Sequence, residues 1–208
     1  MTRRGLSVLL VDGPGMGEAL RFRGIPLHGD YELVGSACLD YLQSRTDVDA
    51  DRIGIVALSL GGYYAPRCAA LDARFKACVA WGAQWDVYAM WERRLEAIKL
   101  GRQVAMPVPV DHVKWVFGVD TFEAALEKLK EFRLDGIVQN MRCPFLLTHG
   151  TEDQQVPMGD AEKLFAAVGS KDKTFRIFTP EEGGAQHCQR DYLTLVCDEI
   201  ADWLAAKL

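Results

Sequence analysis

The chain has 208 residues, of which 49% are hydrophobic and 25% charged, and its net charge is −5 at pH 7. This length suits one globular domain with a sizeable core, and an acidic balance without a basic cluster argues against a nucleic-acid partner. No apolar run approaches the ~20 residues of a membrane helix, and the run after Met1 is too short for a secretory signal, so no membrane association is expected.

The six cysteines lie scattered over predicted helices and strands, and no CxxC pair occurs among them. This spacing is unlike a zinc site or a disulfide framework, so the thiols are read as reduced in a cytoplasmic protein. The glycines at 13 and 15 could suggest a phosphate cradle, but no helix with a following acidic partner fits at the required distance. We therefore expect no metal and no cofactor.

The first predicted elements alternate strand and helix. The apolar runs Leu6–Val11 and Ile53–Ala57 are read as buried strands, and a Gly- and Pro-rich loop follows the first of them. An apolar stripe predicts a helix over Asp30–Arg45, with Asp30 as its cap. A second helix is expected to run to about Leu71, and Phe75–Trp81 is the next buried strand.

Residues 82–141 differ from the rest of the chain. They contain three tryptophans, the sequence Met106-Pro107-Val108-Pro109 and a strong helix at Thr121–Phe132. A segment of this length is too long for a plain loop and too helical for disorder. We expect a helical insertion, or lid, lying over the site, whose aromatic residues form either its own core or a wall for the substrate.

The last third of the chain repeats the strand and helix alternation. Strands are predicted at Pro144–His149 and Lys173–Phe178, and helices at Met158–Val168 and Asp191–Leu208. Such alternation predicts an α/β fold with a doubly wound, mostly parallel sheet.

The stretch from Ala57 to Gly62 is typical of a nucleophile elbow, in which a strand, a sharp turn with one serine and a helix follow one another. The turn requires small residues two positions before and after Ser59, and Ala57 and Gly61 meet this need. The helix start directs N–H groups at the serine, and the N–H of Leu60 is the expected oxyanion donor. The alternative reading is an ordinary strand–helix turn that happens to contain a serine.

A serine hydroxyl needs a base, and the chain order Ser59, Asp153, His187 is the one used in the α/β-hydrolase arrangement. Each of the three follows a predicted strand, and the carboxyl ends of parallel strands meet at one edge of a sheet. We expect His187 to take the proton of Ser59 and Asp153 to orient the imidazole. The alternatives are that Asp153 is a turn residue with Glu152 as the rival acid, and that His187 is an ordinary loop histidine.

At these motifs the chain resembles the α/β-hydrolase family. The segment His149–Pro157 is similar to the acid loop HGxxDxxVP of that family, which puts the acid on Asp153. The segments Val11–Glu18, Ala57–Gly62 and Gly184–Gln189 resemble a branch that contains the fermentation–respiration switch esterase and dihydroxypseudooxynicotine hydrolase. The resemblance covers essentially the whole chain and implies a serine hydrolase of small molecules that cleaves an ester or a ketone-activated carbon–carbon bond.

The sequence departs from the pattern of this branch at its N-terminal end. Members of this branch carry a helical region and three strands before the strand expected at Leu6–Val11, together with the loop that supplies a second oxyanion donor. The sequence is therefore read as N-terminally truncated, and the alternative is that a rearranged loop substitutes for the missing one. A shortened sheet would have an exposed edge strand that could pair with a second copy. The hypothesis that follows is a homodimer.

The branch further implies an auxiliary acid after the strand that follows the elbow. Asp86 and Glu92 are the candidates for this acid or for substrate binding, against the simpler reading of solvated helix charges. Two other functions stay open: a catalytically silent protein that keeps the fold but lacks the oxyanion loop, and an acyltransferase that uses the same site.

Overall fold

The computed structural model describes residues 1–105 and 107–208, and Met106 of the expected insertion lies outside the described residues. The chain forms two compact units. The first comprises Met1–Val8, Glu32–Trp85 and Leu134–Leu208, and the second comprises Leu9–Tyr31 and Asp86–Arg133. The single domain expected over 1–208 stays a prediction.

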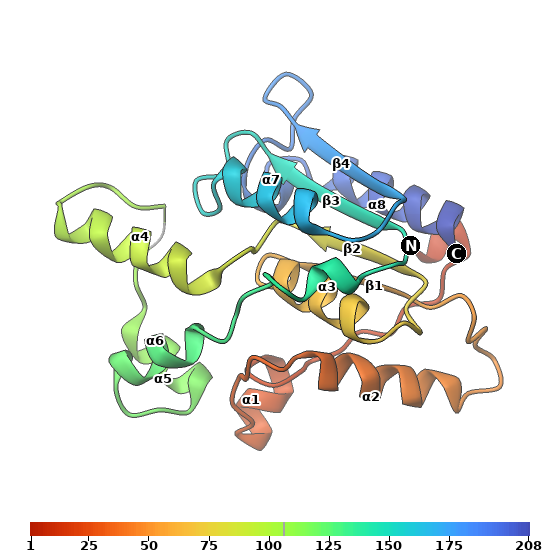
Figure 1. Ribbon diagram of the computed structural model, residues 1–208, viewed down its shortest axis with the longest axis horizontal. Coiled ribbons are helices and arrows are strands. Elements are labelled where there is room, and N and C mark those ends of the chain that lie inside the picture. The colour runs from red at the N-terminus through yellow and green to blue at the C-terminus, as the bar shows by residue number, and fades with distance from the viewer. Residues whose placement is uncertain (106) are drawn as a thin grey trace. The chain divides into compact units, whose positions relative to one another are not determined.

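The first unit is built on a parallel sheet of four strands in the order β1-β2-β3-β4 (Figure 1). The strands are β1 (Gly54–Leu58), β2 (Ala77–Trp81), β3 (Phe145–Gly150) and β4 (Lys173–Phe178). β2 and β3 are buried because neighbouring strands and helices cover them, which agrees with the apolar runs at 77–81 and 145–147. The expected α/β fold with a parallel sheet is confirmed.

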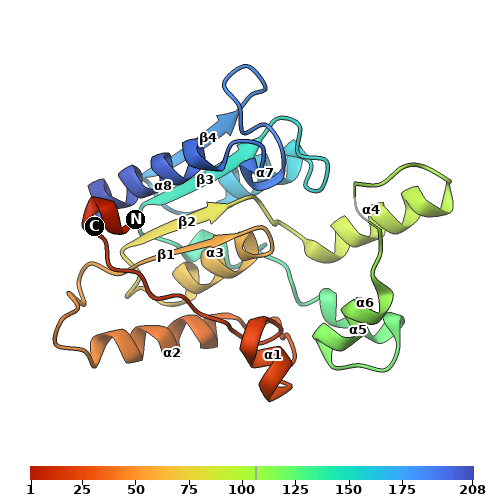
Figure 2. The ribbon, with the colours of Figure 1, turned by 180° about the vertical axis from the view of Figure 1, so that it is seen from behind.

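Helices cover both faces of this sheet, as Figures 1 and 2 show. α3 (Gly61–Leu71) and α7 (Met158–Ala167) lie on one face, and α2 (Glu32–Gln43) packs against α3. α8 (Leu193–Lys207) lies on the other face, where its apolar stripe buries Val196, Ile200 and Leu204 against the strands. Short 3-10 turns occur at η1 (Thr2–Arg4), η2 (Val138–Asn140) and η3 (His187–Gln189).

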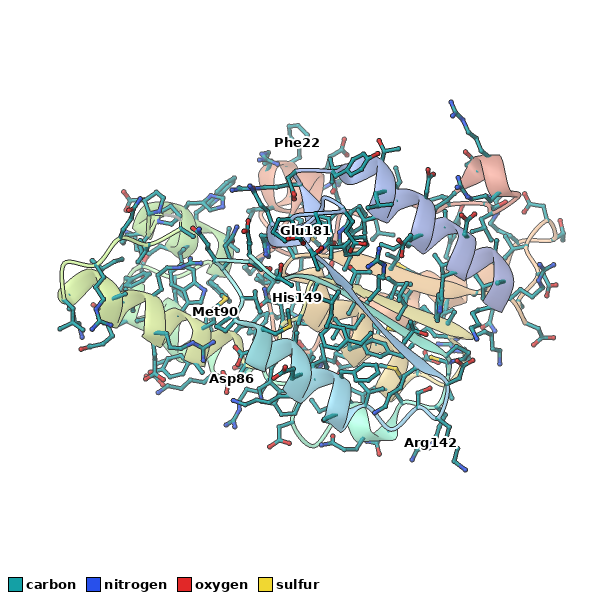
Figure 3. The ribbon with its side chains drawn as sticks, turned by 90° about the horizontal axis from the view of Figure 1, so that it is seen from above. Phe22, Asp86, Met90, Arg142, His149 and Glu181 are labelled. Carbon is teal, nitrogen blue, oxygen red and sulfur yellow. The ribbon has the colours of Figure 1, made fainter. Side chains whose placement is uncertain are left out.

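The second unit is helical. It contains α1 (Gly17–Arg23), α4 (Val87–Lys99), α5 (Val110–Phe117) and α6 (Phe122–Leu129). Thr121 begins α6 by accepting a hydrogen bond from the Ala124 N–H at 3.1 Å, within the predicted helix Thr121–Phe132. The Leu27 N–H donates to the Val116 carbonyl at 2.8 Å and so joins the N-terminal segment to α5. Phe22 projects from α1 and is 76% exposed (Figure 3).

The strand predicted at Leu6–Val11 is wrong. The segment belongs to no sheet, and Val8, Leu9, Leu10 and Val11 are exposed. A strand needs a neighbour for its N–H and C=O groups, and within the described chain the sheet ends at β1. α1 was not predicted either, because the glycines and the proline before it favour a loop.

None of the helices in the described part of the chain combines the length and the apolar character that crossing a membrane requires.

Candidate active site

Ser59 lies on the turn between β1 and α3, in the first unit. Its φ is 60°, a left-handed conformation that residues other than glycine rarely adopt. The Ser59 N–H donates to the Trp81 carbonyl at 2.9 Å, and the Ser59 carbonyl accepts the Gly62 N–H at 2.8 Å. A Cβ on Gly61 would lie 2.4 Å from that of Ala57. The turn therefore needs small residues where the sequence has them.

His187 opens the short turn η3 that follows β4. Its Nε2 lies 2.9 Å from Ser59 Oγ, within hydrogen-bond distance, although the two residues are 128 positions apart. The next two residues, Cys188 and Gln189, both have φ 52°. The carboxylate of Asp191 accepts the backbone N–H groups before His187, at 2.9 Å from Gly184, 3.1 Å from Ala185 and 3.1 Å from Gln186.

Asp153 lies in the loop after β3, and its side chain is only 1% exposed. Its Oδ2 accepts from His187 Nδ1 at 2.8 Å. Its Oδ1 accepts from the N–H groups of Gln155 at 2.8 Å and Val156 at 3.0 Å. Burial acts to raise the pKa of Asp153, but these hydrogen bonds outweigh it and hold the pKa below its ordinary value. The carboxylate is therefore ionised at neutral pH.

The imidazole of His187 is placed between a carboxylate and a hydroxyl. Burial acts to lower its pKa, but the hydrogen bond with Asp153 and the contact with Cys188 outweigh burial and raise the pKa of His187 to about 9. Cys188 Sγ lies 3.4 Å from His187 Nε2, so the thiol and the Ser59 hydroxyl approach the same ring nitrogen.

A second histidine supports the loop that carries Asp153. His149 is fully buried in the sheet layer (Figure 3), and its Nε2 lies 3.1 Å from the Val156 carbonyl. Its Nδ1 is 3.9 Å from Asp153 Oδ2. Burial lowers the pKa of His149, so the ring is neutral and donates Nε2–H to that carbonyl. This contact fixes the end of the acid loop.

The other predicted residues lie elsewhere. Leu60 is the N-cap of α3, so its N–H is among those at the helix start that have no intrahelical acceptor. Asp86 caps α4 by accepting from the Ala89 N–H at 2.9 Å, and it pairs with Arg133 at 3.1 Å. Glu92 is exposed on α4. Both acidic side chains belong to the second unit, and their auxiliary role stays a prediction.

The described residues include no group of three or more His, Cys, Asp or Glu side chains that could hold a metal ion. The contacts of Trp81 and Cys188 with the site were not foreseen. These contacts involve the indole of Trp81 at the end of β2, its backbone carbonyl and the carbonyl and thiol of Cys188. The spacing of residues in the sequence does not indicate such contacts.

Comparison with known proteins gives one family. The model described as "Prolyl oligopeptidase family" matches residues 1–208. The chain is 30% identical over 202 residues to 2,6-dihydropseudooxynicotine hydrolase of Paenarthrobacter nicotinovorans, covering 97% of this chain and 50% of that protein. It is 30% identical over 231 residues to 20-hydroxy-prefusarin hydrolase FUS2 of Gibberella moniliformis, covering 97% and 55%. The chain thus spans about half the length of these curated relatives.

Solved structures give the same likeness. The crystal structure of 2,6-dihydroxy-pseudo-oxynicotine hydrolase matches with a TM-score of 0.78 and 29% identity, covering 95% of this chain and 51% of that one. Acetyl xylan esterase from Paenibacillus sp. R4 matches with a TM-score of 0.60 and 18% identity, covering 85% and 52%. The second likeness concerns the fold alone.

Proposed function

Because the chain belongs to the prolyl oligopeptidase family and has the α/β-hydrolase fold that its motifs predicted, we propose that it is a serine hydrolase of small molecules. In this proposal Ser59 is the nucleophile, His187 the general base and Asp153 the residue that orients it. The observation that carries the proposal is the continuous hydrogen-bonded line of 2.9 Å and 2.8 Å through the two nitrogens of His187.

The proposed reaction starts from the neutral imidazole of His187, the form that predominates above its raised pKa, and from the ionised carboxylate of Asp153. His187 Nε2 removes the hydroxyl proton as Ser59 Oγ attacks the substrate carbonyl, and Asp153 stabilises the imidazolium that forms. The Leu60 N–H donates to the oxyanion. His187 then returns the proton to the departing oxygen or carbon, which leaves an acyl group on Ser59. Water, deprotonated by His187, releases the acid and restores the serine.

The substrate class rests on the relatives. Those reported above are named as hydrolases of pseudooxynicotine and prefusarin compounds, which are small molecules. These names support a small molecule as the substrate. We propose an ester or a ketone-activated carbon–carbon bond as the target, since one triad can serve both. Because the chain spans about half of each relative, the activity of the whole protein is part of the proposal.

The test is hydrolysis of p-nitrophenyl acetate by the wild type and by Ser59→Ala, together with labelling by a fluorophosphonate probe. Ser44→Ala is the matched control, because the Ser44 hydroxyl donates to the Tyr41 carbonyl just after the end of α2. We expect hydrolysis and labelling in the wild type and the control, and neither in Ser59→Ala. Equal rates in the wild type and Ser59→Ala contradict the proposal, and a wild type that neither labels nor hydrolyses is a silent member of the fold. An acyltransferase would instead transfer the acyl group to an added alcohol faster than to water.

A further inference from the structure

Trp81 contacts both catalytic loops at once. It is the last residue of β2, and its backbone carbonyl accepts the Ser59 N–H at 2.9 Å. Its indole Nε1–H donates to the carbonyl of Cys188 at 3.0 Å. Trp81 therefore links the turn that carries Ser59 with the turn that carries His187, through its backbone carbonyl and its indole N–H.

The second of these bonds restrains an unusual backbone. Cys188 and Gln189 follow His187 with φ 52° each, a region that L-residues rarely occupy. Such a turn persists only when its surroundings hold it. Trp81 holds the first of the two residues, and the Thr148 hydroxyl, from β3, lies 3.3 Å from Gln189 Oε1 and holds the second.

The site is sensitive to a rotation of this turn. Cys188 Sγ already lies 3.4 Å from His187 Nε2 and 3.5 Å from the Trp81 carbonyl. Release of the Cys188 carbonyl would let the peptide that joins Cys188 to Gln189 rotate, and the turn that follows His187 would lose this restraint. The imidazole would then lose its alignment on Ser59 Oγ, while the thiol stays within reach of the same nitrogen.

We propose that Trp81 is a positioning residue, whose indole N–H fixes the turn after His187 and so keeps Nε2 on the hydroxyl of Ser59. This inference rests on the proposed function. A bulky ring packed at the edge of the core is the simpler role for Trp81, and the two roles separate chemically. Packing depends on the ring, whereas positioning depends on the N–H.

The experiment compares Trp81→Phe with Trp203→Phe in the full chain, using p-nitrophenyl acetate. Trp203 lies on α8, packs against the same core cluster and is not part of the site, so it controls for the loss of an indole. We expect kcat of Trp81→Phe to fall about 10- to 100-fold with KM changed less than about threefold, because small misplacements of catalytic groups cost about this much. We expect the kinetics of Trp203→Phe to match those of the wild type.

The pH profile is the readout that a packing role would not move. The charged and titratable groups around His187 are Asp153 and His149 from the acid loop and Cys188 from its own turn. A displaced imidazole loses part of its bond with Asp153, so the acidic limb of kcat/KM should move to lower pH in Trp81→Phe. A profile and a kcat equal to those of Trp203→Phe overturn the proposal.

A second variant keeps the test decisive if Trp81→Phe does not fold. Benzothienylalanine incorporated at position 81 keeps the bicyclic shape and replaces the N–H by sulfur. The same loss of kcat with a wild-type thermal midpoint supports positioning, and wild-type kinetics overturn it. Failure of the proposed function is recognised separately, because Ser59→Ala would then hydrolyse the ester as fast as the wild type.

Discussion

Ser59 has the backbone geometry that a nucleophile elbow requires. Its left-handed φ of 60° costs roughly 1–2 kcal/mol for a residue with a Cβ. The conformation is held by the Trp81 carbonyl on its N–H and by the Gly62 N–H on its carbonyl. This conformation places the half-buried side chain of Ser59 at the end of β1, where His187 Nε2 lies 2.9 Å from its hydroxyl.

Replacement of Asp153 tests its contact with His187. In Asp153→Asn the imidazole loses the carboxylate that fixes its tautomer and stabilises its charge, so we expect kcat to fall about 10²- to 10⁴-fold with KM little changed. Steady-state kinetics on p-nitrophenyl acetate measure this. The control is Glu152→Gln, which changes the exposed neighbouring carboxylate in the same way. A comparable loss in both variants would contradict the assignment of the acid to Asp153.

The raised pKa of His187 predicts the pH dependence. The imidazole is a base only when neutral, so kcat/KM should be lost as the pH falls through a pKa above 6.5. The effect on stability has the opposite sign. The folded state favours the protonated ring, so this contribution is full below pH 6.5 and is lost as the pH rises through the raised pKa. Profiles of kcat/KM and urea unfolding curves between about pH 5 and 10 test the two predictions. An acidic limb of kcat/KM centred at or below pH 6.5 contradicts the prediction for activity.

The elements around the elbow pack too closely for side chains at its glycines. A Cβ on Gly62 would lie 1.8 Å from the Gly82 carbonyl oxygen, which belongs to backbone and cannot move aside. We expect Gly62→Ala to lower the free energy of unfolding by about 1–3 kcal/mol or more, measured by urea denaturation. Gly159→Ala on α7 is the control, because nothing lies within 4 Å of its Cβ position, and we expect it to be neutral or stabilising by up to about 1 kcal/mol. Equal effects would contradict the packing argument.

Elements with a strong local pattern were predicted well. β4 occupies the expected Lys173–Phe178, and α8 falls within Asp191–Leu208, because an apolar face and clear ends define each of them. Leu6–Val11 has an equally strong apolar pattern but is not a strand. Pairing depends on a neighbouring segment, and local sequence does not report whether one is present.

The candidate site likewise has features that the sequence predicted and features that it did not. The approach of Ser59, Asp153 and His187 was expected, since parallel strands bring their carboxyl ends to one edge. The supports around them were not expected. The indole bond of Trp81 and the three amides on Asp191 depend on how distant loops meet in space.

At the scale of the whole molecule, exposed apolar surface favours self-association. Leu10 is 89% exposed, beside the exposed Val8, Leu9 and Val11. Among the residues that the structure describes, β1 has a strand neighbour on one side only. Runs of exposed apolar residues and open sheet edges are typical of contact surfaces. We propose that a second copy of the chain covers them. Sedimentation velocity should then show a dimer whose fraction increases with protein concentration.

A matched pair of variants tests this proposal. We expect Leu10→Lys to shift the sedimentation boundary towards the monomer, because a charge in an apolar contact is costly to bury. Thr2→Lys adds the same charge at an exposed position outside the apolar run and should leave the boundary unchanged. A wild type that remains monomeric at all concentrations would contradict the homodimer.

The pairing of β2 with β3 has a consequence for how the molecule could be divided. The two strands are neighbours, yet α4, α5 and α6 separate them along the chain. Ser59 precedes this interval, and Asp153 and His187 follow it. A cut at the exposed Arg102 would give two polypeptides that share the site between them and are joined through backbone ladders and core packing. Neither piece alone would hold Ser59, Asp153 and His187 together, so the proposed site would form only when the two pieces reassociate.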